Sequence, residues 1–167
     1  DGLERLFDPL TNAQTRQWLS QALPRLVARH EQEHEPLCAL LLDLDRFMHF
    51  NDEFGFQAGD DALRRVAQTV WRSMRVNDRL VRVGGEEFVV LLPSTTLEEA
   101  AQAAERVRAS VAATPVRTLR AVTVSIGVAE HHRGAEPEAL IERARVAKFD
   151  AKLGGRNRVA VSPTALR

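Results

Sequence analysis

The sequence predicts an α+β domain in which helices pack on one face of a mainly antiparallel sheet. Short apolar, β-branched runs alternate with longer segments whose apolar residues recur at helical spacing. Two of the short runs, 80–83 and 88–92, are separated by a Gly-Gly pair, which is typical of a hairpin. The resulting β-α-β-β-α-β order predicts a ferredoxin-like palm, an α/β sandwich with flanking helices, to which further elements are added.

The first expected elements are a long helix and a buried strand. Residues 1–8 are charged and read as the end of an incoming helix or linker. Apolar side chains at helical spacing then predict a helix from about 11 to 34, with a possible kink at Pro24. The continuous apolar run 37–42 predicts a strand that is buried on both faces, and a helix with one apolar stripe is expected from about 60 to 74.

The remaining elements surround the hairpin. The glycine pair between its strands predicts a turn whose residues take positive φ. Thr95 or Thr96 is expected to cap the next helix, which carries its apolar stripe from 97 to 111. After it we expect a strand at 122–129, a loop at 131–137, a helix at 137–153 that ends at Gly154-Gly155, and a short edge strand at 158–161.

Composition limits the possible functions. The chain has 167 residues, which fits one domain, and its 23 basic and 23 acidic residues argue against broad capture of nucleic acid or anionic membrane. The single cysteine, Cys38, indicates a reducing compartment, and we expect it to be buried and unreactive. No apolar stretch approaches the roughly 20 residues of a membrane span, so we expect a cytoplasmic domain. Because the chain begins at Asp1 rather than Met, we expect a piece of a longer protein, whose upstream part could be a sensor or a membrane anchor.

Acidic residues gather at the hairpin and at the end of the first buried strand. Glu86 and Glu87 follow Gly84-Gly85 directly, and these glycines leave the backbone bare for a ligand. Asp43 closes the buried strand, where a carboxylate can share a hard divalent cation with a neighbouring hairpin. The alternative is an ordinary solvated hairpin. Asp45 faces the same side as Asp43 in a regular strand, and we favour for it the role of a cap on the following turn.

Two further groups of polar residues suit nucleotide recognition. Asn51 and Asp60 flank a turn-rich segment, 52–59, and an amide with a carboxylate can read the edge of a purine such as guanine. Lys152 and Arg156 lie on either side of a glycine turn, which suits phosphate recognition. Alternatively, the first pair caps helices and the second pair stabilises a helix dipole.

Taken together, these motifs resemble the GGDEF family of diguanylate cyclases in order and in spacing, from Asp8 to Val159. The resemblance implies a nucleotidyl cyclase domain of the GGDEF type at 8–162, an upstream linker at 1–7 and a C-terminal tail at 163–167. The motifs that carry it are Asp8-Pro9-Leu10-Thr11 with Arg16, Asp43-Leu44-Asp45-Arg46-Phe47, Asn51-Asp52, Phe54-Gly55, Gly59-Asp60, Gly84-Gly85-Glu86-Glu87-Phe88, Val124-Ser125-Ile126-Gly127-Val128, and Lys152 with Gly155-Arg156-Asn157.

The resemblance also implies an activity and a set of roles. The activity is the Mg²⁺- or Mn²⁺-dependent condensation of two GTP molecules into cyclic di-GMP and pyrophosphate across a homodimer. By resemblance, the metal ligands are Asp43, Glu86 and the backbone carbonyl of Leu44, the catalytic residues are Asp43, Glu86, Glu87 and Lys152, and the substrate-binding residues are Phe47, Asn51, Asp60, Gly84, Gly85 and Arg156.

A second site is implied just before the hairpin. Arg75-Val76-Asn77-Asp78 resembles the RxxD inhibitory motif of the family, and Arg106 occupies a position similar to another arginine of that site. Arginines that stack on and bridge to guanines suit a compact dinucleotide, so we expect cyclic di-GMP to inhibit there. The alternative is a surface Arg–Asp pair.

The chain also departs from the family pattern. Met48 stands where a Lys is usual and Phe56 where a His is common, while Asn12, Ala13 and Thr15 replace Gly, Leu and Asn. Met48 removes one cation that would face the phosphates. Two alternatives to the cyclase therefore stay open: a catalytically impaired module that binds cyclic di-GMP or GTP, and a cyclase that makes another cyclic nucleotide. The adjacent His131-His132 pair is expected to be solvated in a loop.

Overall fold

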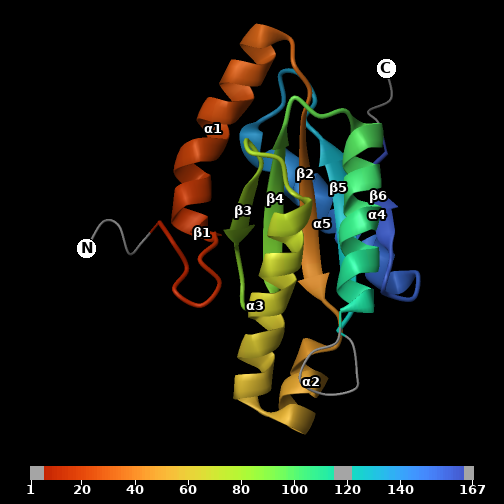
Figure 1. Ribbon diagram of the computed structural model, residues 1–167. Helices are drawn as coiled ribbons and strands as arrows, with labels where there is room; N and C mark the ends of the chain where they lie inside the picture. Colours follow the sequence, from red (N-terminus) through yellow and green to blue (C-terminus); the bar gives the residue numbers. More distant parts are fainter. Residues whose placement is uncertain (1–5, 115–121, 164–167) are drawn as a thin grey trace.

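The computed structural model describes residues 6–114 and 122–163. In this part of the chain, helices and strands alternate around one sheet (Figure 1). The elements are β1 (Gln14–Thr15), α1 (Arg16–Glu33), β2 (Leu37–Leu44), α2 (Phe47–Phe54), α3 (Phe56–Ser73), β3 (Arg79–Arg82), β4 (Glu87–Pro93), α4 (Leu97–Ala113), β5 (Val124–Glu130), α5 (Pro137–Leu153) and β6 (Val159–Val161).

The strands form one mixed sheet in the order β1-β3-β4-β2-β5-β6. The inner four, β3, β4, β2 and β5, pair antiparallel with their neighbours. The two short edge strands, β1 and β6, pair parallel with β3 and β5. The antiparallel centre with two crossover helices is the predicted ferredoxin-like palm, so the α+β fold class is confirmed.

Helices cover both faces of this sheet, so the expectation that they lie on one face is wrong. Every residue of β2 is buried, because its side chains alternate between two separate cores. One core joins the sheet to α3 and α4, and the other joins it to α1 and α5. In Figure 1, α3 and α4 lie in front of the sheet and α5 lies behind it. The second layer comes from α1 and α5, which lie outside the β-α-β-β-α-β order.

The first helix begins later than the predicted residue 11. Asn12 adopts a left-handed conformation with φ 61°, which ends any helix there and which Asn tolerates better than most residues. Thr15 is the N-cap of α1 and accepts a hydrogen bond from the Trp18 amide at 3.3 Å. The helix then runs through Pro24 to Glu33.

The segment 52–59 is helical, so the prediction that Asn51 and Asp60 flank a loop is wrong. The segment is divided between α2 and α3, which meet at Gly55, where φ is 89°. Three phenylalanines of α2 offset its turn-forming residues: their rings stack along the helix and pack on the core, and they are Phe47, Phe50 and Phe54.

Neither Gly84 nor Gly85 has positive φ, so the prediction that the hairpin turn needs glycine for positive φ is wrong. The hairpin turn closes instead through the Val83 amide, which donates to the carbonyl oxygen of Glu87 at 3.0 Å. A Cβ added at Gly85 would meet nothing within 4 Å. The glycine therefore leaves open space on the hairpin rather than relieving strain.

Other local predictions are confirmed. Thr96 caps α4 through a capping box with Glu99, and α5 ends at Leu153, just before Gly154-Gly155. Cys38 is fully buried, and burial raises the pKa of its thiol to about 12, which makes it unreactive. Within the described residues, no helix has both the length and the apolar character that crossing a bilayer requires.

Candidate active site

The acids of the hairpin and the acid at the end of β2 lie side by side. Asp43 is the direct cross-strand partner of Glu87 in the β2–β4 ladder. One residue further along, the Leu44 amide donates to the carbonyl oxygen of Glu86 at 3.1 Å. Since directly opposed residues point to the same face of a sheet, the carboxylates of Asp43 and Glu87 share one side. The C-terminal end of β2 is therefore the centre of the candidate site.

Two lysines of α5 reach these carboxylates. Lys148 Nζ lies 3.3 Å from Asp43 Oδ2 and 2.9 Å from Glu87 Oε2. Lys152 Nζ, one helical turn later, lies 3.5 Å from Asp43 Oδ1 and 3.4 Å from Asp45 Oδ1. The structure thus brings together three of the predicted catalytic residues, Asp43, Glu87 and Lys152, and adds a fourth group.

Lys148 is the residue that the sequence reasoning missed. Its side chain is only 3% exposed, although lysine is rarely buried unless it is paired. A signal was present in the sequence, because Lys148 follows Ala144 by four residues and so lies on the buried stripe of α5. A charged residue on an apolar stripe needs a buried partner, and here the partners are the site's own acids.

Burial raises the pKa of the Asp43 carboxyl, and the charges of Lys152 and Lys148 oppose this shift without cancelling it. The cost of removing a carboxylate from water therefore exceeds the gain from its two ammonium partners. An additional positive charge at Asp43 would favour its ionised form.

Asp45 ties the end of α5 to the sheet, so the prediction that it caps the following turn is wrong. Its carboxylate accepts hydrogen bonds from Thr123 Oγ1 at 2.8 Å, from Ser125 Oγ at 2.6 Å and from the Asn157 amide at 2.9 Å. The N-cap of α2 is Arg46, without a side-chain cap. Since Lys152 contacts both Asp43 and Asp45, the two acids do face the same side, as expected.

The N-terminal motif holds the hairpin turn. Arg82 donates from Nη1 to both carboxylate oxygens of Asp8 at 3.2 Å and from Nη2 to the carbonyl oxygen of Gly85 at 2.8 Å. Arg16 donates to the carbonyl oxygen of Val83 at 2.6 Å. Burial acts to raise the pKa of Asp8, but hydrogen bonds from Thr11 and the charge of Arg82 outweigh it and lower that pKa. The turn that carries Glu86 is thus fixed from two sides.

The oxygen donors at the end of β2 fit a hard divalent cation such as Mg²⁺ or Mn²⁺. No described residue pairs with the carboxylate of Glu86. The backbone carbonyl oxygen of Glu86 accepts a hydrogen bond from the Leu44 amide. Asp43, Glu86 and the Leu44 carbonyl would hold the ion. Among residues 6–114 and 122–163, however, no three His, Cys, Asp or Glu side chains form a ready metal cluster. Oxygens of a bound ligand would have to complete the coordination.

The predicted guanine readers lie where α2 meets α3. Asn51 Oδ1 is buried and has no hydrogen-bond partner within the part of the chain that the structure describes. A Cβ at Gly59 would lie 1.8 Å from that oxygen and 3.2 Å from Phe47 Cζ, so the glycine makes room for both side chains. Asp60, the next residue, is exposed on α3. A buried amide oxygen without a partner is uncommon in proteins and suggests a ligand that supplies the missing donor.

Arg156, the second residue predicted to bind phosphate, lies near Asp45. It lines a cavity of about 250 Å³ with Asp45, Asn157 and residues of α2, and its buried Nε has no partner in residues 6–114 and 122–163. Two of the departures from the family pattern, Met48 and Phe56, are 77% and 81% exposed, so neither disturbs the core. Four buried side-chain atoms lack a partner among the described residues, and two of them, Asn51 Oδ1 and Arg156 Nε, belong to residues predicted to bind substrate.

The three predicted inhibitory residues line one small cavity of about 30 Å³ between α3 and α4. The Asp78 carboxylate accepts a hydrogen bond from the Arg75 amide at 2.8 Å, and the Arg75 guanidinium lies 3.9 Å from Glu99. Arg106 reaches the same cavity from α4. Burial raises the pKa of the Asp78 carboxyl, and the hydrogen bond from the Arg75 amide and the charges of Arg75 and Arg79 oppose this shift without cancelling it.

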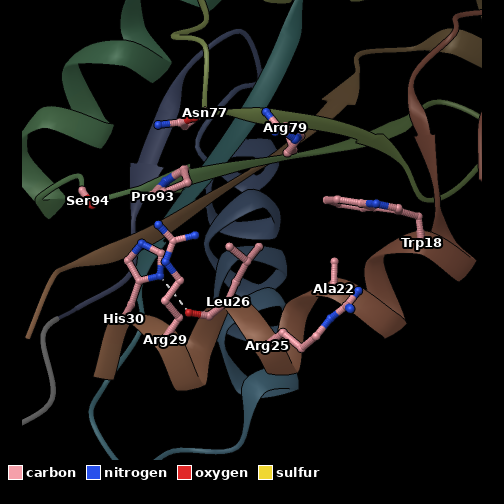
Figure 2. Close-up of a pocket in the computed structure, with 10 residues that line it drawn as sticks. All are labelled: Trp18, Ala22, Arg25, Leu26, Arg29, His30, Asn77, Arg79, Pro93 and Ser94. Atoms are coloured by element: carbon pink, nitrogen blue, oxygen red, sulfur yellow. Dashed lines mark hydrogen bonds between the residues drawn. The ribbon is translucent and has the colours of Figure 1, made fainter. Parts of the chain in front are cut away.

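A separate cavity of about 350 Å³ lies between α1 and the β3–β4 edge (Figure 2). Figure 2 shows Trp18, Arg25 and Arg29 projecting from α1, with Arg79 across from them on β3. None of the residues predicted to form the catalytic or inhibitory site lines this cavity.

His131 corrects a smaller prediction. The loop after β5 exists, but the imidazole of His131 is not solvated: its side chain is 5% exposed and pairs with Glu31 at 2.8 Å. The loop is therefore docked against the end of α1.

The domain is thus an α+β palm in which the paired acids of a glycine hairpin face lysines of a helix. A family model described as "Diguanylate cyclase, GGDEF domain" matches residues 5–158. The chain belongs to the GGDEF family of diguanylate cyclases.

Individual relatives agree with this assignment. The chain is 41% identical over 160 residues to the diguanylate cyclase DgcP of Pseudomonas aeruginosa. The aligned region covers 94% of this chain and 24% of DgcP. The GGDEF domain of DgcB from Caulobacter crescentus, solved in complex with c-di-GMP, superposes with a TM-score of 0.90 at 34% identity and covers 95% of this chain and 94% of that one. SiaD of Pseudomonas aeruginosa, solved in complex with its activator SiaC, superposes with a TM-score of 0.89 at 35% identity and covers 96% and 64%. The chain thus spans about a quarter of the length of DgcP.

Proposed function

We propose that this domain is an active diguanylate cyclase, which condenses two GTP molecules into cyclic di-GMP and releases two pyrophosphates. The observation that carries the proposal is the adjacency of Asp43 on β2 to the Glu86-Glu87 tip of the hairpin, with Lys152 facing them from α5. This supports a site for a metal ion and a triphosphate, and family membership supports GTP as the substrate.

Each group has a defined task in this proposal. Asp43, Glu86 and the Leu44 carbonyl would hold Mg²⁺ or Mn²⁺. When bound, such an ion would lower the pKa of the attacking ribose 3′-hydroxyl and offset phosphate charge. Glu87 supports the metal site, and the bare backbone of Gly84 and Gly85 admits the nucleotide.

The remaining site residues orient the substrate. Lys152 and Arg156 bind the terminal phosphates, and the buried, unpartnered Nε of Arg156 supports this role. Asn51 and Asp60 read the guanine edge beside the ring of Phe47. The room that Gly59 leaves around Asn51 supports this assignment. Positioning and electrostatic stabilisation then provide most of the acceleration.

The reaction requires two copies of the domain. Each copy holds one GTP, and the 3′-hydroxyl of one nucleotide attacks the α-phosphate of the other, so that pyrophosphate leaves. The same step repeats with the roles exchanged and closes the ring. A homodimer with the two sites face to face is therefore part of the proposal.

Incubation of the pure protein with GTP and Mg²⁺ tests the function. We expect one cyclic di-GMP for every two pyrophosphates, and no turnover after Glu86→Ala. Steady pyrophosphate release by Glu86→Ala would contradict the proposal. A wild type that binds GTP without product would instead support the impaired module, and a mixed ATP and GTP feed that gives another cyclic product would show that the guanine readers are misassigned.

We also propose that cyclic di-GMP inhibits at Arg75, Asp78 and Arg106. The convergence of these side chains on one cavity supports a shared ligand. Calorimetry should show that Arg75→Ala weakens cyclic di-GMP binding by about tenfold or more, as expected for loss of a charge-assisted contact. Arg72→Ala, which removes an exposed arginine of α3, is the matched control. Equal affinity of the two variants would remove this site.

A further inference from the structure

Lys148 is enclosed beneath the catalytic carboxylates. Its ammonium lies between Asp43 and Glu87, at 3.3 Å and 2.9 Å, and also over the Phe149 ring at 3.9 Å from the ring centroid. Its side chain is 3% exposed, against 19% for Lys152, so the Lys148 ammonium is enclosed by protein groups of the site.

The backbone of α5 holds Lys148 in this place. The helix packs so closely on β5 that a Cβ at Gly127 would lie 2.0 Å from the carbonyl oxygen of Ala144 and 2.3 Å from the Lys148 amide. This close packing fixes the position of the Lys148 backbone relative to Asp43 and Glu87.

The charges around β2 nearly balance without any bound ion. Lys148 and Lys152 contact Asp43, Asp45 and Glu87, and Arg145 Nη2 lies 4.0 Å from Glu87 Oε1. Each of these three carboxylates therefore has a cationic partner, whereas no described residue pairs with the carboxylate of Glu86.

We infer that Lys148 is a built-in counter-ion of the catalytic carboxylates, which keeps the nucleotide-free site from binding a divalent cation tightly. The inference rests on the proposed function of Asp43 and Glu86 as metal ligands. A fixed ammonium that contacts the carboxylate of a metal ligand repels an incoming cation. The nucleotide's phosphates add the negative charge and the oxygen ligands that the protein lacks, so the metal ion binds with GTP rather than before it. Lys148 is in this sense a positioning residue, which acts through Asp43 and Glu87.

Titration with Mn²⁺ in the absence of nucleotide, followed by electron paramagnetic resonance of the free ion, tests the inference. We expect Lys148→Met to bind Mn²⁺ at least about tenfold more tightly than the wild type, since it removes a charge in contact with the carboxylates and keeps an unbranched side chain. An unchanged or weakened affinity would overturn the inference.

Arg143→Met is the matched control, because it removes a cation of the same helix. Arg143 donates to the carbonyl oxygen of Glu130, which pairs with Cys38, whereas Ser125 pairs with Asp43. Ser125 and Glu130 lie five positions apart along β5, or roughly 16 Å at the usual strand rise. We expect Mn²⁺ affinity equal to that of the wild type, and a gain as large as that of Lys148→Met would overturn the inference.

A second comparison covers the possibility that Lys148→Met does not fold. The double variant Lys148→Met with Glu87→Gln leaves no unpaired buried charge at this pair. It should bind Mn²⁺ at least about tenfold more tightly than Glu87→Gln alone, because the two differ only in the lysine charge. Equal affinities would overturn the inference.

The two proposals can fail separately. The titration contains no GTP, so its outcome does not depend on turnover. The expected titration together with a wild type that makes no cyclic di-GMP would support the counter-ion and overturn the cyclase. Formation of cyclic di-GMP by the wild type, together with equal Mn²⁺ affinities of the wild type and Lys148→Met, would support the cyclase and overturn the counter-ion.

Discussion

At the scale of single residues, Gly59 shapes the candidate guanine site by lacking a side chain. Gly59→Ala would place a methyl group 1.8 Å from Asn51 Oδ1, so the amide must move away. We expect KM for GTP to rise about tenfold, as for loss of a hydrogen bond to the base. Alanine is favoured over glycine within a helix by about 1 kcal/mol, which offsets the cost of moving the amide. We therefore expect the free energy of unfolding to stay close to that of the wild type. Steady-state kinetics and urea unfolding of the same variant separate the two effects, and an unchanged KM would contradict the role of Asn51.

Residue roles could be predicted where a motif was continuous in sequence. Asp43 and the Glu86-Glu87 pair stood out because acids are unusual at the end of an apolar run and within a strand. The pairing of Lys148 with Asp43 and Glu87 could not be predicted, because it joins residues 105 and 61 positions apart. Only the position of a lysine on the buried stripe of α5 pointed to it.

At the scale of elements, the turn before α1 acts as an anchor for the hairpin. Asp8 binds Arg82, and Arg82 holds the carbonyl oxygen of Gly85. Because the pKa of Asp8 is lowered, its stabilising effect is fully present above the ordinary carboxyl pKa of about 3.9 and is lost as the pH falls through the lowered value.

Asp8→Asn should therefore be less stable than the wild type at pH 7, and the difference should shrink towards zero as the pH falls below about 4. Urea unfolding at a series of pH values measures the difference. Glu33→Gln, which removes a half-exposed surface partner of Arg29, should change stability little at any pH. A deficit of Asp8→Asn that grows on acidification would contradict the pairing.

The contact between α5 and β5 leaves no space at Gly127. Its substitution by Ala would drive a methyl group into backbone atoms of Ala144 and Lys148, which cannot move independently of the helix. We expect a loss of about 2–3 kcal/mol in unfolding free energy and a displaced Lys148. Thermal and urea unfolding measure the loss. Wild-type stability in Gly127→Ala would show that α5 does not lie as close to the sheet as the structure indicates.

Elements with a continuous pattern were predicted more accurately than those with a mixed one. The predictions of β2 from its apolar run and of the capped α4 are correct, whereas the segment 52–59, whose acids and glycines predict a loop, belongs to α2 and the start of α3. The apolar contacts of Phe47, Phe50 and Phe54 outweigh those turn formers. The burial of β2 on both faces already implied helices on both sides of the sheet, which conflicted with the single helical layer expected from the order of the elements.

At the scale of the whole molecule, the fold gathers its chemistry at one end of β2. Residues 43–45 contact the hairpin, α5 and the loop after α5, and α2 begins two residues later. The second helical layer matters for this arrangement, because α5 brings both lysines to the acids. The palm could be predicted from the order of the elements, whereas the helical layer on the second face was indicated only by the expected burial of β2 on both faces.

The proposed reaction also predicts a dependence on protein concentration. Because one domain's GTP attacks the GTP of another, the rate per domain should rise with protein concentration below the dimer dissociation constant. Initial rates over about a 100-fold dilution series measure this dependence. A constant specific activity with a domain that stays monomeric in sedimentation would contradict a reaction between two copies.

The central claim is that Asp43 and Glu86 share a divalent ion beneath the phosphates of a guanine nucleotide. Mn²⁺ titration in the presence of a non-hydrolysable GTP analogue tests it most directly, with Asp43→Asn and Glu86→Gln compared with the wild type and with Glu33→Gln. We expect both site variants to bind Mn²⁺ at least about tenfold more weakly and Glu33→Gln to bind it as the wild type does, since each site variant loses a charged ligand. Wild-type affinity in both site variants would show that Asp43 and Glu86 do not share the ion.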